Sequence, residues 1–280
     1  MTRRLIKRAK QAVFMLLESS DVGFRFSLRL RYGASRPKGY PDAPWHNAVL
    51  RDRAEATGAT NQARRLGLPS NPDHEKNWDS LAALDLILNS TENNAQILDA
   101  GGERYSMITP WLYMYGYNNL HVGNITFGKP SRRGPIRYLY CDITQTDFES
   151  DSFDAITCLS VIEHGVDAEA YFREMSRILK PGAVLITSTD YFEPKVETGD
   201  KEAYGTPVRV FCKREIVELL SAAAQFGLIP TGSIDLTCNE SVVEWERLNL
   251  AYTFVVFSLR KDASFPRPLR DAVQLVRDRE

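Results

Sequence analysis

The sequence predicts an α/β fold built on an open, mostly parallel sheet. Short apolar segments alternate with amphipathic helical segments from Trp78 onward, which is typical of strand–helix units with parallel strands. One of these segments, Ala155–Leu159, is apolar enough to form a strand buried on both faces. Sheets of this kind bind ligands beyond the carboxyl ends of their strands, so we expect the functional residues directly after the strands.

The strands are predicted from the apolar segments in chain order. The parallel strands are Ala95–Asp99, Leu120–Ile125, Ile136–Cys141, Ala155–Leu159 and Ala183–Thr187. Two later segments, Thr231–Thr237 and Tyr252–Leu259, could pair as an antiparallel edge.

The helices are predicted from apolar periodicity and from residues that begin or end a helix. The first starts near Trp78, where Asn77 is a plausible N-cap. The others are a helix from about Thr109, where Pro110 fits the first turn, a helix that Asp167 caps and Pro181-Gly182 ends, and Glu215–Phe226, which Gly227 closes.

A length of 280 residues fits one large domain, or one domain with a substantial extra segment. We expect residues 1–76 to be an N-terminal extension of loops and short helices that serves as a lid or substrate region. The α/β domain is expected over residues 77–261, followed by a charged tail over residues 262–280.

Composition and charge exclude several classes. The net charge of −1 gives no basic excess for broad nucleic-acid binding. The four cysteines form no CxxC pair, so no zinc or other metal site is predicted, and buried free thiols in a reducing cytoplasm are expected. No apolar run approaches the roughly 18 residues of a membrane span. The basic N-terminus, MTRRLIKRAKQAVFMLL, either lies on a membrane as an amphipathic helix or packs against the domain.

The segment ILDAGGERYS runs from an apolar strand into a glycine-containing turn. Glycine lets the backbone turn sharply and approach a ligand closely. Asp99 could face a cationic group there, such as the ammonium of a bound amino acid. The alternative is an ordinary strand-to-helix turn with a capping aspartate.

Two further segments carry polar residues at strand ends. In RYLYCDITQTDFESDSFDAITCLSVIEHG, Asp142 follows one strand and could accept a hydrogen bond from an exocyclic amine such as that of adenine. Ser160, Glu163 and His164 follow the next strand. EMSRILKPGAVLITSTDY then gives a helix, a Pro-Gly turn and a buried strand.

The order and spacing of these segments, from Trp78 to Lys261, resemble the class I S-adenosylmethionine-dependent methyltransferase family. The nearest branch in wording is that of ubiquinone/menaquinone-type and glycan-modifying small-molecule enzymes. The resemblance implies a Rossmann-like fold, with a mostly parallel seven-stranded sheet, an antiparallel last strand and helices on both faces. It also implies S-adenosyl-L-methionine as the cofactor. The residues it implies are Asp99, Gly101 and Gly102 in the methionine-side turn, Asp142 at the adenine amine, Ile143 beside the ring and Ser160 in the wall facing the transferred methyl.

Two departures from the family pattern matter. Glu103 and Tyr105 stand at the second and third glycine positions of Asp-x-Gly-x-Gly-x-Gly. Asn124 stands where the family usually has a carboxylate that grips both ribose hydroxyls. Because asparagine can accept one bond and donate another, we expect it to bind the ribose, but more weakly. The turn also lacks GxGxxG, which argues against a nicotinamide enzyme.

His164 is the best-placed candidate for a catalytic base, and Glu163 is the alternative. Both could instead hold the loop after their strand. Asp190, Tyr191 and Tyr204 could face the acceptor, or they could belong to a polar loop that satisfies its own hydrogen bonds. Arg209 could grip a charged group of the acceptor or form a surface salt bridge. The cluster His74, Lys76, Asn77, Trp78 and Asp79 is either a lid anchored by Trp78 or an ordinary helix start.

The sequence therefore predicts methyl transfer to a small-molecule acceptor, with a sugar or cell-surface glycan precursor as the candidate. Glu103 and Asn124 keep open the alternative of a degenerate fold that acts as a non-catalytic binding or scaffold protein. A protein or RNA acceptor has no positive signal in the sequence.

Overall fold

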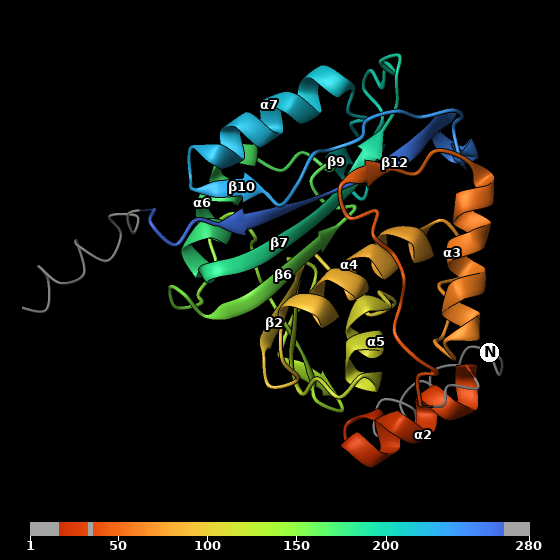
Figure 1. The fold of residues 1–280 in the computed structure, drawn as a ribbon, viewed down its shortest axis with the longest axis vertical. Coiled ribbons are helices and arrows are strands. Elements are labelled where there is room, and N and C mark those ends of the chain that lie inside the picture. Colours follow the sequence, from red (N-terminus) through yellow and green to blue (C-terminus); the bar gives the residue numbers. More distant parts are fainter. Residues whose placement is uncertain (1–16, 33–35, 266–280) are drawn as a thin grey trace, which may run out of the picture.

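The computed structural model describes residues 17–32 and 36–265. Its centre is a ten-stranded sheet whose main path runs β1-β12-β7-β6-β2-β3-β5-β4, while β10 and β11 pair with β12 (Figure 1). The strands are β1 (Ala48–Val49), β2 (Gln96–Ala100), β3 (Asn119–Gly123), β4 (Ser131–Arg133), β5 (Ile136–Leu139), β6 (Phe153–Leu159), β7 (Leu179–Tyr191), β10 (Leu228–Pro230), β11 (Val243–Trp245) and β12 (Leu250–Lys261). A separate hairpin consists of β8 (Glu202–Ala203) and β9 (Thr206–Pro207).

The predicted sheet is confirmed. Strands β5, β3, β2, β6 and β7 are parallel neighbours, and β12 adds antiparallel to β7. With β10 on the other side of β12, these strands make the expected seven. The additional strands β1, β4 and β11 have only two or three residues each, too few for a periodic signal in the sequence.

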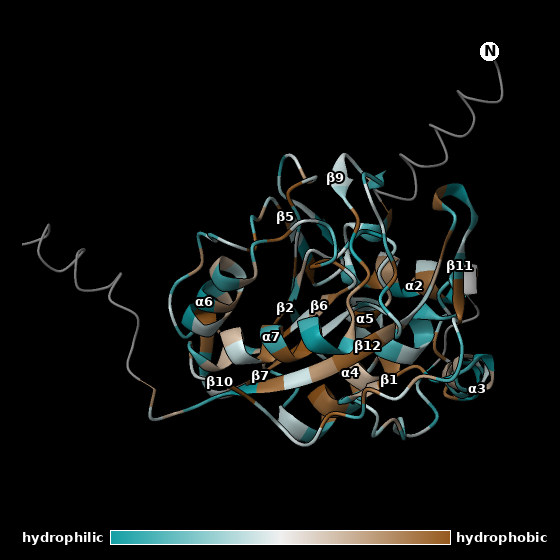
Figure 2. Ribbon diagram, turned by 90° about the horizontal axis from the view of Figure 1, so that it is seen from above, coloured by the Kyte–Doolittle hydropathy of each residue, from teal (hydrophilic) through white to brown (hydrophobic). Residues whose placement is uncertain are grey.

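Helices cover both faces of the sheet. They are α2 (Asp21–Tyr32), α3 (Arg53–Arg65), α4 (Lys76–Ser90), α5 (Ile108–Met114), α6 (Ala168–Ile178) and α7 (Lys213–Ala224), with the short 3₁₀ helix η1 (Glu246–Leu248). Two neighbouring residues of β2 show that there is a layer on each face. Ile97 packs in the core beneath α3, α4 and α5, whereas Leu98 packs in the core beneath α6 and α7. Apolar residues accordingly gather along the central strands, as the view from above shows (Figure 2).

Some helix ends agree with the prediction and some do not. Asp167 caps α6, because its Oδ1 accepts from the Ala170 amide at 3.0 Å. Asn77 is not an N-cap, since α4 already begins at Lys76. The Asn77 side chain is buried and donates to Thr60 Oγ1 at 3.1 Å, so it ties α3 to α4 instead. Helix α6 ends at Ile178, and the Pro-Gly pair that we expected to end it lies inside β7.

The antiparallel edge was predicted with the wrong partner. Tyr252–Leu259 lies within β12 as expected, but Leu228–Pro230, and not Thr231–Thr237, pairs with its far end. The segment that follows β10 bends because the Asp235 carboxylate accepts from the Thr237 amide at 3.0 Å. Such a local bond competes with the hydrogen bonds of a strand.

The N-terminal part of the chain joins the sheet through β1, which pairs with β12 at Ala48 and Val256. Within the described residues, no helix combines the length and apolar character needed to cross a bilayer. The basic segment 1–16 and most of the predicted tail, residues 266–280, lie outside the described residues.

Candidate active site

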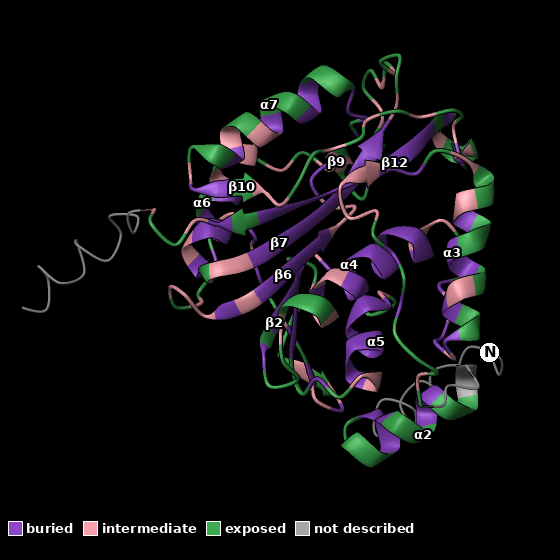
Figure 3. Cartoon of the chain, viewed as in Figure 1, coloured by how far each residue is buried: buried purple, intermediate pink, exposed green. Residues whose placement is uncertain are grey.

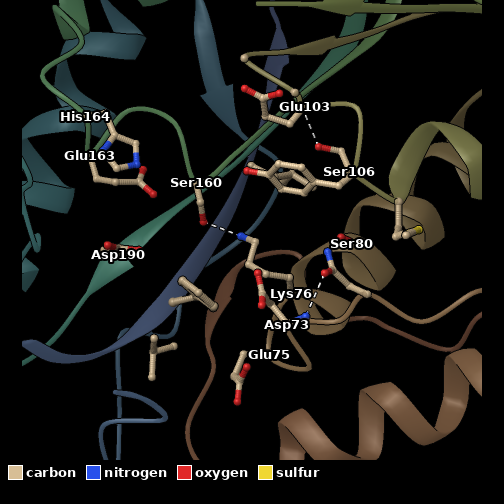
Figure 4. A pocket seen from close by; sticks show the side chains of 18 of the residues that line it. Asp73, Glu75, Lys76, Ser80, Glu103, Ser106, Ser160, Glu163, His164 and Asp190 are labelled. Carbon is tan, nitrogen blue, oxygen red and sulfur yellow. Dashed lines mark hydrogen bonds between the residues drawn. The ribbon is translucent and has the colours of Figure 1, made fainter. Parts of the chain in front are cut away.

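A cavity of about 670 Å³ lies at the carboxyl ends of the parallel strands (Figure 4). Strands β2, β6 and β7 bring Asp99, Ser160 and Asp190 to it from three separate parts of the chain. The predicted site residues that line this cavity are Asp99, Gly101, Gly102, Ser160, Glu163 and His164. Asn124, Asp142 and Ile143 are not among its lining residues.

The turn after β2 is closely packed. Gly101 has φ of +79°, and a Cβ there would lie 2.5 Å from Val161 Cγ1. A Cβ at Gly102 would lie 2.0 Å from Asp99 Oδ2. Larger residues are therefore excluded at both positions unless the backbone moves, which explains the two glycines.

The Asp99 carboxyl group is buried beneath this turn. Its Oδ1 accepts from Thr157 Oγ1 at 2.7 Å, while Oδ2 is buried without a hydrogen-bond partner among the described residues. Burial raises the pKa of Asp99 to about 7. A buried oxygen without a partner is costly, so Asp99 is a strong candidate to accept a hydrogen bond from a ligand.

Asn124 holds the turn from outside the cavity. Its Nδ2 donates to the carbonyl oxygens of Gly101 at 2.8 Å and Gly102 at 3.2 Å, and its Oδ1 accepts from the Thr126 amide at 2.8 Å. The hydrogen-bonding groups that we expected to face a ribose are thus engaged with the protein.

Glu103 lies beside Asn124 and does line the cavity. Its Oε1 accepts from Thr126 Oγ1 at 3.3 Å and lies 3.4 Å from Asn124 Nδ2, while its amide donates to Ser106 Oγ at 2.9 Å. A carboxylate therefore stands beside the end of β3, although the residue that follows the strand is an asparagine.

Asp142 and Ile143 follow β5, next to β3 in the sheet. The Asp142 Oδ1 accepts from the amide of Thr144 at 2.9 Å and from its hydroxyl at 2.6 Å, which closes a local turn. The Ile143 side chain is buried in the core. The structure does not bring these two residues into one cavity with Asp99.

Lys76 crosses the cavity from the start of α4. Its Nζ lies 2.5 Å from Asp79 Oδ2 and donates to Ser160 Oγ at 2.5 Å, while its charge sits 4.4 Å from the centre of the Phe254 ring (Figure 4). Asp79 is fully buried and also accepts from Ser188 Oγ at 2.7 Å. The predicted lid cluster therefore contributes an ion pair to the cavity itself.

The two candidate bases occupy different surroundings. Glu163 is buried, its Oε2 accepts from Thr189 Oγ1 at 3.0 Å, and burial raises its pKa to about 7. His164 has a buried Nδ1 without a partner among the described residues and packs edge-on against Tyr204, with 5.6 Å between ring centres. Burial lowers the pKa of His164, so its imidazole is neutral near pH 7.

Asp190 extends this acidic region. Burial, together with the nearby charge of Glu163, raises the pKa of Asp190 well above its ordinary value. Tyr252 offsets part of this rise in the pKa of Asp190, and Tyr252 itself lines the cavity. The cavity floor can therefore hold protons or a cationic ligand, because Lys76 alone does not balance its carboxyl groups.

The wall formed by β11, η1 and β12 was not predicted from the sequence. Trp245, Arg247, Tyr252 and Phe254 line the cavity from this side. The available signal was strand direction. Because β12 runs antiparallel to β7, its first residues lie at the same edge where the parallel strands end.

Not every expected acceptor residue reaches the cavity. Tyr204 lines it, but Arg209 pairs with Glu215 at 2.8 Å, and Tyr191 donates to the Leu236 carbonyl at 2.9 Å. Trp78 is buried and stacks on Trp45 with 6.2 Å between ring centres.

Part of the chain is similar in sequence to known proteins. Residues 92–187 match the model of a family described as a methyltransferase domain. Sterol 24-C-methyltransferase of Debaryomyces hansenii is 31% identical over 112 residues, which are 37% of this chain and 29% of that protein. Ubiquinone biosynthesis O-methyltransferase of Xanthomonas oryzae pv. oryzae is 46% identical over 41 residues, which are 15% of this chain and 17% of that protein. The chain thus spans less than a third of the length of these curated relatives.

A solved structure shares the fold over most of the chain. It is 1,6-didemethyltoxoflavin-N1-methyltransferase of Burkholderia thailandensis with bound 1,6-didemethyltoxoflavin and S-adenosylhomocysteine. The TM-score is 0.51 at 19% sequence identity, and the match covers 81% of this chain and 94% of that one.

Proposed function

We propose that this chain, whose residues 92–187 form a class I methyltransferase domain, transfers a methyl group from S-adenosylmethionine to a small-molecule acceptor. The observation that carries the proposal is the acidic cavity beside the Asp99 turn. When bound, S-adenosylmethionine supplies a methyl group already activated on a sulfonium. The carboxyl groups of Asp99 and Glu163 suit the positive charges of its ammonium and sulfonium groups.

The turn residues hold the methionine end of the cofactor. Asp99 would offer the ammonium its Oδ2, which has no partner within the described ranges, and Gly101 and Gly102 would let the backbone approach. Glu103 takes the ribose hydroxyls, since a carboxylate can accept two hydrogen bonds. Asn124 acts through the turn that it holds in place.

The proposed cofactor site has three further residues, which are Ser160, Asp142 and Ile143. Ser160 lies in the wall beside the transferred methyl, where Lys76 fixes its hydroxyl. Asp142 and Ile143 lie on the adenine side, beyond the end of β5. Their approach to the ring requires the segment after β5 to close over it, because neither lines the cavity.

Glu163 is the base that takes a proton from the acceptor. Its pKa of about 7 matches the working range of a general base, and it lines the cavity close to Ser160. His164 lines the same wall and is the second candidate, in its neutral form. The protein otherwise aligns the reacting atoms and excludes water.

A sugar is the acceptor that the lining favours. Aromatic side chains of Tyr204 and Trp245 can pack on the C–H face of a sugar ring, while Glu163 and Asp190 can accept from its hydroxyls. The free thiols of all four cysteines support a cytoplasmic location, because an oxidising compartment favours disulfides.

Calorimetric titration with S-adenosylmethionine tests the proposal. We expect saturable binding that Asp99→Asn weakens, because Asp99 lines the cavity, and that Pro181→Ala, which does not line it, leaves unchanged. No heat at high micromolar cofactor would favour the scaffold alternative. With binding established, labelled methyl transfer to a panel of nucleotide sugars tests the acceptor, and the absence of any labelled sugar would remove that part.

A further inference from the structure

Helix α2 presents an apolar row to solvent. Val22, Phe26 and Leu30 follow one another at four-residue spacing and are 79%, 55% and 62% exposed. The other side of the same helix is already packed, through Phe24 and Leu28. The alternation of exposed and buried positions along α2 is visible in Figure 3. An exposed apolar row on a helix that is anchored by another face marks an interaction surface.

Arginines run alongside this row. Arg25 and Arg29 lie one helical turn apart on α2 and, with Arg36, line a groove of about 630 Å³. No aspartate or glutamate lines this groove in the described part of the chain. Arg25 donates to the Tyr113 hydroxyl at 3.2 Å and forms an ion pair with Asp21 at 3.7 Å, at the exposed start of the helix.

The charge of the chain is distributed unevenly along the sequence. Residues 1–36 contain nine Lys and Arg and only two acidic residues, although the full chain has a net charge of −1. The positive charge is therefore concentrated at the N-terminal end, where α2 lies. Such asymmetry favours an anionic partner.

We propose that α2 docks on an anionic lipid bilayer. Val22, Phe26 and Leu30 enter the headgroup region, and Arg25 and Arg29 lie beside the lipid phosphates while their aliphatic stems cover the apolar row. A lipid surface uses both the apolar and the cationic row, whereas a nucleic acid would leave the apolar row in water. This docking is independent of the proposed chemistry, because no residue of α2 lines the cavity.

Vesicle co-sedimentation of the 280-residue chain tests the proposal. We expect binding to vesicles that contain phosphatidylserine, weak binding to pure phosphatidylcholine, and loss of binding as salt rises. Phe26→Ser with Leu30→Ser should reduce partitioning about ten-fold, because the inserted side chains are removed. Arg25→Gln with Arg29→Gln should reduce it about five-fold for each charge.

The matched control is Val217→Ser with Ile229→Ser, which removes apolar side chains that are 50% and 49% exposed on α7 and β10. This control should bind vesicles as the wild type does. The proposal is overturned if the wild type does not bind anionic vesicles, or if the Phe26/Leu30 variant binds as well as the control. Cofactor titration of the same variants should be unchanged, which separates this test from that of the methyltransferase function.

Discussion

Glu163 has its carboxyl group buried against the hydroxyl of Thr189, and burial raises its pKa from 4.5 to about 7. The folded protein therefore keeps a proton that the unfolded chain loses above its ordinary pKa. The stabilisation from this group is present below the unfolded pKa and is lost as the pH rises toward 7. As a base, however, Glu163 must be ionised, so activity should rise over the same range.

Glu163→Gln separates these two effects. The amide can still accept from Thr189, so the fold should be retained, and stability at pH 8 should increase relative to the wild type because no buried charge forms. Methyl transfer should fall about a hundred-fold, and the rise of kcat/KM with pH near 7 should disappear. Persistence of that rise would assign it to another group, and His164→Gln would then be the variant to examine.

Gly101 and Gly182 form a matched pair for the turn after β2. Both have φ of +79°, but a Cβ at Gly101 would meet Val161, whereas nothing lies within 4 Å of one at Gly182. Gly182→Ala should cost about 1 kcal/mol from backbone conformation alone. Gly101→Ala should cost about 2–4 kcal/mol, because the overlap adds to it. Urea unfolding measures both, and equal losses would show that the contact with Val161 has no effect.

Among the helices and strands, α4 contributes its first turn to the cavity wall. Lys76 joins this turn to the end of β6 through Ser160, and its partner Asp79 is joined to β7 through Ser188. The start of the helix is thus connected to two parallel strands by polar contacts. Any movement of α4 would change the wall beside the proposed methyl position.

Lys76→Met leaves the buried charge of Asp79 without its counter-ion. We expect a loss of about 3 kcal/mol in the free energy of unfolding. Adding Asp79→Asn should restore part of this loss, since the buried charge is then removed as well. Urea unfolding of the two single variants and the double variant gives the coupling between the residues, and strictly additive effects would contradict it.

At the scale of the whole molecule, cofactor binding should stabilise the entire fold, because the cavity is built from strands at the centre of the sheet. At a hundred times the dissociation constant, the gain is about 2.7 kcal/mol. For a domain of this size, Tm should then rise by about 5–10 °C. Differential scanning calorimetry with S-adenosylmethionine measures the shift, and an unchanged Tm would contradict binding at this site.

The sheet could be predicted from sequence because its parallel strands are apolar runs with clear limits. Ala155–Leu159, for instance, lies within β6. The positions of Asp99, Glu163 and His164 at the cavity followed from the rule that strand ends meet at one edge. Strand β1 could not be found in this way, since its two residues are fixed only by pairing with β12.

The directions in which side chains point could not be predicted from the sequence. The rule of strand ends places Asn124 at the site but cannot show that its amide turns away to hold Gly101 and Gly102. Glu103 is recognisable in the sequence as a departure from the family pattern, yet its position beside Thr126 depends on the path of the loop. Tyr252 was not predicted as a site residue because it lies at the beginning of a strand. It reaches the cavity only because that strand runs antiparallel to β7.

Because β12 runs antiparallel to its neighbour, the walls of the cavity come from two separate segments of the chain. The turn that faces the proposed cofactor comes from the first half of the α/β domain, whereas Trp245, Arg247 and Tyr252 come from one continuous hairpin near the end of the chain. An exchange of residues 243–252 should therefore change this wall of the cavity, and with it the proposed acceptor, while the Asp99 turn stays as it is. The shape and charge of this wall can be altered by replacing one short peptide, so this hairpin is the natural place to begin a redesign.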